Sequence, residues 1–291
     1  MEEVQKKGYL EGDYRLFYLK TLPEREIEPH YHDFHKVLLL LKGQIGYSIE
    51  GRSYPLLPGD VVLVGAGEIH NPVFQGKDAY ERVILYLSPS YGSLFGEEAE
   101  GLLRFFEREE RRAYLLRPQG NLQSALSRLT QELLSSWQEV WGGGEEAPFA
   151  RLYQRLKVTE LMILLSQAAG QEGRLEEMGV QSSPAVDDCI RYISSHLQED
   201  LSVETIASAL FLSKSYLMHR FKDQTGMTIG EFIREKRLFS ARKALAEGAS
   251  VTDACYLSGF KNYSSFYYAY KKKYGHAPRE GMPLMVSSRE E

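Results

Sequence analysis

Two stretches near the end of the chain repeat one pattern, and this repeat limits the fold more than any other feature of the sequence. SVETIASALFLSKSYLMHRFKDQTG (202–226) and SVTDACYLSGFKNYSSFYYAYKKKYG (250–275) both begin with Ser-Val and continue as a short helix containing small residues. A turn follows, one residue longer in the second copy, and then a residue suited to an N-cap, Ser213 or Asn262. From there the copies stay in register at an offset of 49. The matched pairs are Leu217 with Phe266, Phe221 with Tyr270, Lys222 with Lys271 and Gly226 with Gly275.

Each copy is predicted to form a helix, a short turn and a second helix, which together make a helix-turn-helix. In the second helix, the two apolar residues four positions apart lie on one face and would pack against the preceding helix. The opposite face is left for solvent or a partner. We predict that this outward stripe consists of Ser215, Met218, His219 and Lys222 in the first copy and of Tyr263, Ser264, Tyr267, Tyr268 and Lys271 in the second.

The spacing of the two copies suits double-stranded DNA. A helix fits the major groove, and a helix-turn-helix presents one helix to that groove. The N-terminal end of such a helix directs amide donors at phosphates, while lysines near its other end neutralise further phosphates. The bridge 229–248 would hold a helix of about 18 residues, or roughly 27 Å. A strut of that length can set two reading helices about one DNA turn apart on the same face.

The distribution of charge along the chain also favours DNA binding by the C-terminal part. The net charge of the whole chain is −5. Residues 1–182 carry 20 Lys and Arg and 27 Asp and Glu, whereas residues 211–280 carry 13 Lys and Arg and 6 Asp and Glu. A basic segment on an acidic body is expected where one domain alone meets a polyanion. The two cysteines, Cys189 and Cys255, are not in a metal-ligand spacing, and no apolar run has the length of a membrane span. We therefore expect a reducing, cytoplasmic location.

The first part of the chain has a different character. Residues 36–73 alternate short strand-like runs with Gly and Pro turns, as in a β-barrel or sandwich. From about residue 93 the pattern becomes helical, with one apolar stripe in 121–141 and a second helix in 148–169. The predicted fold class is α+β and multidomain, with an N-terminal barrel and an all-α C-terminal pair of helix-turn-helix units. The predicted divisions are a barrel (1–92), a helical dimerisation or packing segment (93–170), a linker (171–184), a DNA-binding domain (185–281) and a disordered tail (282–291).

Residues 185–281 resemble the DNA-binding domain of the AraC/XylS family of transcription regulators. The resemblance is carried by LSVETIA, LSKSYLMHRFKDQTGMTIGEFI, REKRLFSARKAL and SGFKNYSSFYYAYKKKYGHAP, in that order. It implies that the second helix of each unit reads bases through Ser215, Met218, His219, Tyr263, Ser264, Tyr267 and Tyr268. Tyrosines and a methionine replace several arginines and glutamines of some relatives, so contact with thymine methyl groups is expected to supply more of the readout.

The β region resembles a cupin barrel, the usual N-terminal partner in that family. His30, His32 and His70 lie in EPHYHDFHKVLLLLKG and LLPGDVVLVGAGEIHNP, and alternate residues of one strand face inward together. Lys36 stands where a metal cupin has a glutamate, and a protonated amine cannot ligate a metal ion. We predict that His30, His32, Lys36 and His70 bind a small effector, an anionic or polyhydroxylated one by their chemistry and a sugar or related metabolite by the family resemblance. No cofactor is required. A divalent metal on His30, His32 and His70 is the alternative.

Several alternatives remain open at this point. A three-histidine cupin could be a metal-dependent enzyme, but the missing carboxylate and the attached DNA-binding region argue against it, so a non-enzymatic activator or repressor is favoured. An RNA-binding or architectural protein would show weak sequence preference. The apolar stripe with Leu126, Leu129, Leu133 and Trp137 would either cover the barrel or pair with a second subunit. The resemblance implies a homodimer, and contact with RNA polymerase is a further expectation.

Overall fold

The computed structural model describes residues 10, 12–22, 27–74, 79–107, 114–141, 147–170 and 182–281. It separates into two units, Met1–Gln181 and Ser182–Glu291. Most of the predicted linker (171–184) and all of the predicted tail (282–291) lie outside the described residues.

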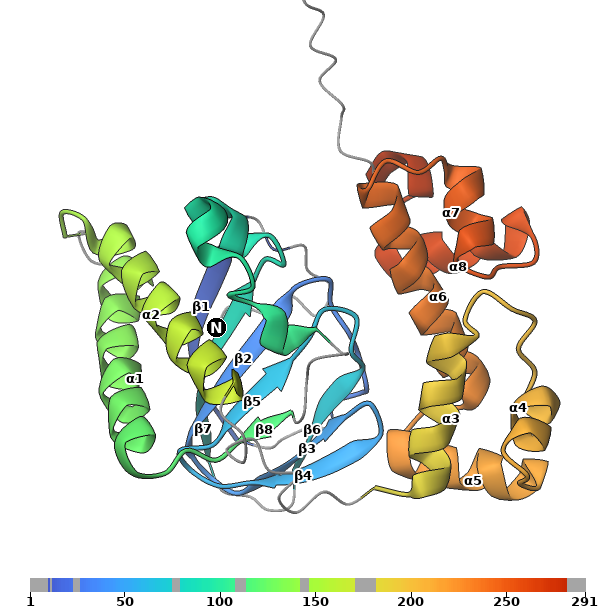
Figure 1. The fold of residues 1–291 in the computed structure, drawn as a ribbon, viewed down its shortest axis with the longest axis horizontal. Helices are drawn as coiled ribbons and strands as arrows, with labels where there is room; N and C mark the ends of the chain where they lie inside the picture. The colour runs from blue at the N-terminus through green and yellow to red at the C-terminus, as the bar shows by residue number, and fades with distance from the viewer. Residues whose placement is uncertain are drawn as a thin grey trace, which may run out of the picture. The chain divides into compact units, whose positions relative to one another are not determined.

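In its described part, the first unit contains two antiparallel sheets that face one another (Figure 1). The larger sheet has the strand order β1-β7-β2-β5-β8, and the smaller has the order β4-β3-β6. The strands are β1 Tyr14–Thr21, β2 His35–Lys42, β3 Ile45–Ile49, β4 Arg52–Leu56, β5 Val61–Val64, β6 His70–Phe74, β7 Tyr80–Leu87 and β8 Leu115–Leu116. The hairpin between β3 and β4 turns at Glu50 and Gly51, whose φ angles of 48° and 75° suit a type I′ turn.

The larger sheet is buried on both faces, which explains the nearly continuous apolar run in β2. Leu38 and Leu40 point into the cluster between the two sheets. Val37 and Leu39 point into a second cluster on the other face, beneath the helices. This period of two fixes which side chains can reach the interior of the barrel.

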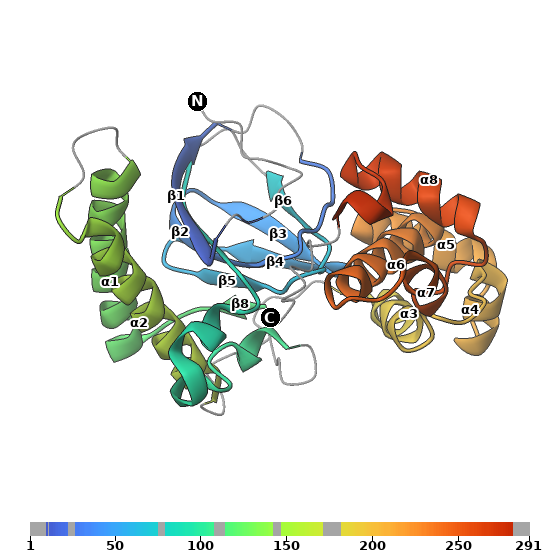
Figure 2. The same cartoon turned by 90° about the horizontal axis from the view of Figure 1, so that it is seen from above.

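Two helices, α1 Gly120–Trp141 and α2 Ala150–Gly170, pack on the outer face of the larger sheet (Figure 2). Leu126, Leu129 and Leu133 are buried in the same cluster as Val37 and Leu39, so this part of the stripe covers the barrel. The partly buried Trp137 packs at the edge of that cluster.

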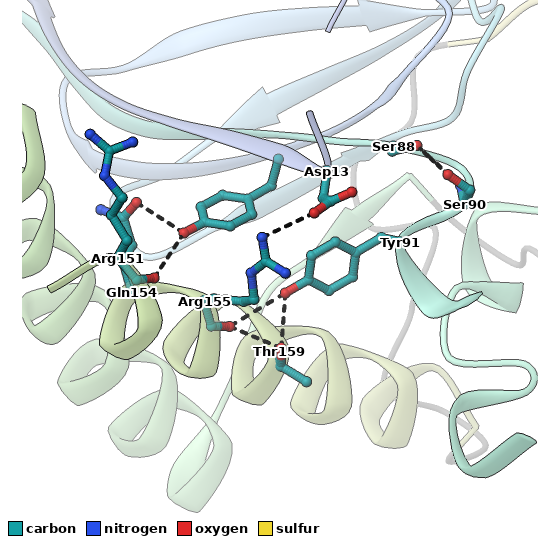
Figure 3. A network of polar contacts seen from close by, with 9 residues as sticks. Asp13, Ser88, Ser90, Tyr91, Arg151, Gln154, Arg155 and Thr159 are labelled. Atoms are coloured by element: carbon teal, nitrogen blue, oxygen red, sulfur yellow. Dashed lines mark hydrogen bonds and ion pairs between the residues drawn. The ribbon is translucent and has the colours of Figure 1, made fainter. Parts of the chain in front are cut away.

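Polar contacts fasten α2 to the barrel (Figure 3). The hydroxyl of Tyr91 lies 2.9 Å from the Thr159 hydroxyl and donates to the Arg155 carbonyl at 3.3 Å. The Arg155 guanidinium binds the Asp13 carboxylate at 3.0 Å. One side of α2 therefore contacts the barrel of its own chain.

The prediction of a helical segment from about residue 93 is wrong in one respect. After two short 3-10 helices, η1 Tyr91–Ala99 and η2 Arg104–Phe106, the chain returns to the larger sheet as β8. There Leu116 pairs with Val61 and Leu115 with Val62. Two residues are too few for a periodic pattern to reveal, and the barrel therefore uses residues beyond 92.

The second unit is helical throughout its described part. Its elements are α3 Pro184–Ser195, α4 Val203–Ala209, α5 Lys214–Thr225, α6 Ile229–Ala246, α7 Val251–Leu257, α8 Tyr263–Tyr274 and the 3-10 helix η3 Pro278–Gly281. Cys189 and Cys255 are both free and fully buried, as small core residues. None of the helices in the described ranges combines the length and the hydrophobicity that a membrane crossing needs.

One turn of this unit is strained at an exposed residue. Phe211, between α4 and α5, has a φ of 57° and is 96% exposed, whereas Gly259 takes a φ of 90° in the corresponding turn before α8. Replacing Phe211 by glycine should raise the free energy of unfolding by about 1 kcal/mol, because a side chain in the left-handed region costs roughly that much. Denaturant unfolding measures the gain. Phe211→Ala keeps the strain and should give no gain; an equal gain would show that loss of the exposed ring is the cause.

Candidate DNA interface and effector site

The ends of α5 and α8 are built in the same way. Ser213 accepts a hydrogen bond from the Tyr216 amide at 3.3 Å, and Asn262 accepts one from the Ser265 amide at 2.8 Å. Both helices contain 12 residues and end at a glycine in the left-handed conformation, Gly226 or Gly275. The first helices of the two copies, α4 and α7, are also capped by serines. The predicted repeat is confirmed in its capping and in its register.

The division between buried and outward faces is also confirmed. Leu217, Phe221 and Phe266 are 0% exposed and Tyr270 is 1% exposed, so these positions anchor both helices. The predicted outward residues are exposed, apart from the half-buried Tyr267: Ser215, Met218, His219 and Lys222 on α5, and Tyr263, Ser264, Tyr268 and Lys271 on α8. The rings of Tyr263 and Tyr267 are stacked, with their centroids 6.2 Å apart.

Three further exposed residues border these stripes and were not singled out from the sequence: Tyr216 and Arg220 on α5 and Lys272 on α8. Within the described ranges, neither Lys222 nor Lys271 nor Lys272 forms an ion pair, whereas Lys273 pairs with Glu235 at 2.5 Å. The run of three lysines in the sequence indicated a basic surface. Helical periodicity alone did not distinguish Lys273, which pairs with Glu235, from the outward Lys271 and Lys272. The unpaired lysines are available to phosphate groups.

The bridge between the two copies is the single helix α6, and its two halves belong to different copies. Near its start, Phe232 packs edge-on against Phe221 of α5, with ring centroids 5.4 Å apart. In its second half, Leu238, Ala241 and Leu245 share a core with α7 and α8. Its start is fixed by a capping box between Thr228 and Glu231. The 18 residues of α6 match the predicted strut.

The predicted effector residues meet at one end of the barrel. His30 and His70 form an isolated antiparallel bridge, with amide-to-carbonyl distances of 3.1 and 2.9 Å. The ring of His70 lies 4.6 Å from that of His30 and 4.8 Å from that of His32. Lys36 joins this group through Tyr47, because its Nζ donates to the Tyr47 hydroxyl at 2.8 Å and the Tyr47 ring stacks on His70 at 6.0 Å. All four predicted residues are therefore brought together.

Burial sets the protonation of this group. The Nδ1 atoms of His32 and His70 face the carbonyls of Phe34 and Glu68 at 2.8 and 2.9 Å. Burial and, to a lesser extent, the charge of Lys36 hold the pKa of both imidazoles well below the usual range. Neutral rings that donate from Nδ1 present the lone pair of Nε2, and these two Nε2 atoms are buried without a hydrogen-bond partner among the described residues.

Lys36 is itself perturbed. Burial, with a smaller contribution from the charge of Arg82, lowers the pKa of Lys36 to about 7. Arg82 lies on β7, opposite Leu40 of β2, and is a buried basic residue that the sequence interpretation missed. Its alternation with Ile84 and Tyr86 in ERVILYLS was the available signal, because alternate residues share one face of a strand.

The low pKa of Lys36 predicts how stability depends on pH. Between pH 7 and 10.5 the folded protein binds fewer protons at Lys36 than the unfolded chain, so this residue makes stability rise with pH across that window. Below pH 7 the penalty of the buried charge is fully present. Lys36→Met should therefore raise the free energy of unfolding at pH 6 by a few kcal/mol, with a gain that shrinks towards pH 10. Tryptophan-detected unfolding measures this; a gain that does not change with pH would contradict it.

The described residues include no group of three or more His, Cys, Asp or Glu side chains arranged to hold a metal ion. The alternative metal site on His30, His32 and His70 remains a prediction without support from this geometry.

Comparison with known proteins bears on both regions. The model of the AraC-like ligand binding domain matches residues 16–165, and that of a helix-turn-helix domain matches residues 206–281. The chain is 26% identical over 261 residues to the HTH-type transcriptional activator RhaS of Citrobacter koseri, covering 89% of this chain and 88% of the relative. It is 27% identical over 251 residues to the probable transcriptional regulator LumQ of Photobacterium leiognathi, covering 86% and 89%.

Solved structures with some likeness include ToxT from Vibrio cholerae, at 13% identity and a TM-score of 0.35, covering 92% of this chain and 97% of that one. The C-terminal domain of AraT, a response regulator from Geobacillus stearothermophilus, is 24% identical with a TM-score of 0.35, covering 37% of this chain and 94% of that one. Scores of this size do not establish a common overall arrangement.

Proposed function

Because this chain belongs to the AraC family of transcription regulators, we propose that it activates transcription by sequence-specific binding of two helix-turn-helix units to promoter DNA, under the control of a small effector in the barrel. Activation is proposed because relatives such as that of Citrobacter koseri are described as transcriptional activators. The family consists of regulators and not of enzymes. We propose action in the cytoplasm, with RNA polymerase as a further contact.

One observation carries the DNA-binding part of this proposal. The outward faces of α5 and α8 carry exposed polar and aromatic side chains at repeat-related positions, while α6 packs against both copies through its two halves. A pair of helices held by one rigid strut can occupy successive major grooves without further ordering of the protein. Lys222 and Lys271 would neutralise phosphates and position the pair, and the aromatic residues would contact bases.

The effector is proposed to be a sugar or related metabolite that binds at His30, His32, Lys36 and His70. Effector control requires that the ligand bind two arrangements of the protein with different affinity, because otherwise it cannot shift their populations. Two neutral imidazoles with buried lone pairs suit the hydroxyl groups of such a ligand.

Selection of binding sites from random duplex DNA tests the function. The full-length protein should enrich one bipartite site and bind it at least about 1,000-fold more tightly than unrelated DNA at the same salt concentration. Enrichment of no sequence would contradict the proposal and favour an architectural DNA-binding protein. Comparable binding to single-stranded RNA would favour the RNA-binding alternative.

A homodimer is also proposed, with α2 as the contact. The side of α2 that faces away from its own barrel exposes an apolar stripe, consisting of Phe149, Leu152, Tyr153, Leu156 and Ile163, in or directly before the helix. Leu156 is 57% exposed. Exposed apolar residues at helical spacing are typical of a surface that pairs with another.

Replacing Leu156 by glutamate should weaken this dimer at least tenfold, or about 1.4 kcal/mol, because a charge would be buried in the contact. Light scattering at micromolar concentration measures the effect. Gln138→Glu adds the same charge to an exposed position of α1 and should leave the dimer intact. A wild-type monomer, or equal dimerisation of Leu156→Glu, would contradict the proposed contact.

A further inference from the structure

Two cations are buried inside the barrel. Lys36 on β2 is 6% exposed and Arg82 on β7 is 7% exposed. Both stand in the alternation that faces the smaller sheet, with Leu38 and Leu40 on β2 and with Ile84 on β7. A buried charge is costly unless an opposite charge or a full set of hydrogen bonds compensates for it.

The contacts of these cations are all with neutral groups. Lys36 Nζ donates to the Tyr47 hydroxyl at 2.8 Å and lies 5.5 Å from the centre of that ring. Arg82 Nη1 donates to Thr21 Oγ1 at 2.6 Å and to the Tyr80 carbonyl at 3.1 Å, and its guanidinium carbon lies 4.0 Å from the Tyr80 ring centre. The Nε of Arg82 is buried and has no hydrogen-bond partner within the described part of the chain.

The buried carboxylates of this region are engaged by the backbone. Glu50 accepts a hydrogen bond from the Ile69 amide at 2.7 Å, and Glu68 accepts one from the Gly65 amide at 2.5 Å. Neither Lys36 nor Arg82 forms an ion pair with any carboxylate of the described ranges. Two basic side chains in the same interior thus lack a negative partner there, and Lys36 is fully charged only below its lowered pKa of about 7.

The histidines supply hydrogen-bond acceptors, whereas Lys36 and Arg82 supply donors. Across the described ranges, no donor reaches the buried Nε2 atoms of His32 and His70, which are acceptors. Tyr47 connects His70 to Lys36, because it binds Lys36 through its hydroxyl and stacks on His70. A ligand at this place would meet strong donors on one side and acceptors on the other.

We propose that the effector is a polyhydroxylated acid, with its anionic group bound by Lys36 and Arg82 and its hydroxyl groups donating to His32 and His70. This inference rests on the proposed function in one respect, namely that the barrel binds an effector. It goes further by requiring an acidic group together with hydroxyl groups, where the sequence left these as alternatives, and by adding Arg82 as a recognition residue. An anion of this kind supplies the charge that both cations lack, and it uses the free lone pairs of both imidazoles.

The test uses the full-length protein and matched sugars. Tryptophan-detected thermal unfolding is measured with galactose, galacturonate and galactose 1-phosphate, and with glucose, glucuronate and glucose 6-phosphate. At least one acid should raise the unfolding temperature where its neutral parent does not. The carboxylate and phosphate members identify the kind of anion. Lys36→Met and Arg82→Met should each weaken binding of that acid at least tenfold, while Lys42→Met, at the exposed end of the same strand, should not.

A second readout needs no ligand. If the cations lack a counter-ion, Arg82→Met should raise the unfolding temperature of the ligand-free protein, whereas removal of one member of an internal ion pair should lower it. A lowered temperature, a shift by neutral sugars alone, no shift by any of the acids, or an acid-induced shift that survives both substitutions would overturn the inference. If the wild-type protein still selects a bipartite DNA site in that case, the DNA-binding function stands without an acidic effector.

Discussion

Replacing Gly259 by alanine should lower the stability of the second helix-turn-helix far more than the same replacement at Gly275, the other glycine of this copy. A Cβ at Gly259 would lie 2.3 Å from the Leu197 carbonyl oxygen and 2.8 Å from Arg237 Nε, and the φ of Gly259 is 90°. Arg237 donates to the carbonyls of Leu197 and Glu199 at 3.0 and 2.7 Å, so the new methyl would displace this link between α6 and the segment that follows α3. We expect a loss of about 3–5 kcal/mol from strain, overpacking and weakened hydrogen bonds together.

Circular dichroism of the full-length protein measures this loss through its helical signal, while tryptophan fluorescence reports separately on the first unit, which holds both tryptophans. Gly275→Ala is the matched control. Gly275 has a φ of 83°, but its added Cβ would meet no atom of the described residues within 4 Å, so only the conformational cost of about 1–2 kcal/mol applies. Equal losses in the two variants would show that the close approach at Gly259 does not matter. A change in the tryptophan transition would show that the effect is not local.

Replacing His219 or Tyr268 by alanine should reduce affinity for the selected DNA site by about 1–3 kcal/mol each, or roughly tenfold to more than a hundredfold. Both side chains lie on the outward stripe, with Tyr268 73% exposed. Because α5 and α8 would read different half-sites, each variant should relax base preference at its own half-site only. Binding to DNA variants with single base changes measures this.

Lys222→Met and Lys271→Met serve as the comparison, because phosphate contacts carry no sequence information. These variants should weaken binding to all sequences alike and reduce the slope of affinity against salt concentration by about one each. If the lysine variants and the His219 and Tyr268 variants behaved alike across sequences, the assignment of the outward stripe would be wrong.

The repeated unit was the most predictable part of this protein. Helix caps, the apolar pair four residues apart and the final glycine are local signals, so the register of Leu217 with Phe266 was legible in the sequence. Lys36 was legible for the same reason, because alternation within β2 is also local. His30 and His32 were expected on one strand, but both lie before β2, His30 at an isolated bridge to His70, so their approach to His70 did not follow from alternation. The family resemblance added what these residues could be used for.

Features that depend on contacts between distant segments were less predictable. The two-residue strand β8 exists because Leu115 and Leu116 complete the edge beside β5, and no local pattern marks it. Alternation placed Arg82 on one face of β7 with Ile84 and Tyr86, but the burial of that face became clear only once β7 was placed beside β2. Likewise, the close approach of Gly259 to Leu197 depends on where the segment after α3 packs, 62 residues earlier in the chain.

Uracil interference on the selected DNA site tests most directly whether α5 and α8 read DNA as a pair. Replacing thymine by uracil removes only the C5 methyl group, the group that Met218 and the tyrosines are proposed to contact. Two clusters of sensitive thymines should appear about 10 base pairs apart on one face of the duplex, one lost in Met218→Ala and the other in Tyr268→Ala. A single cluster, or two clusters on opposite faces, would contradict the paired reading helices.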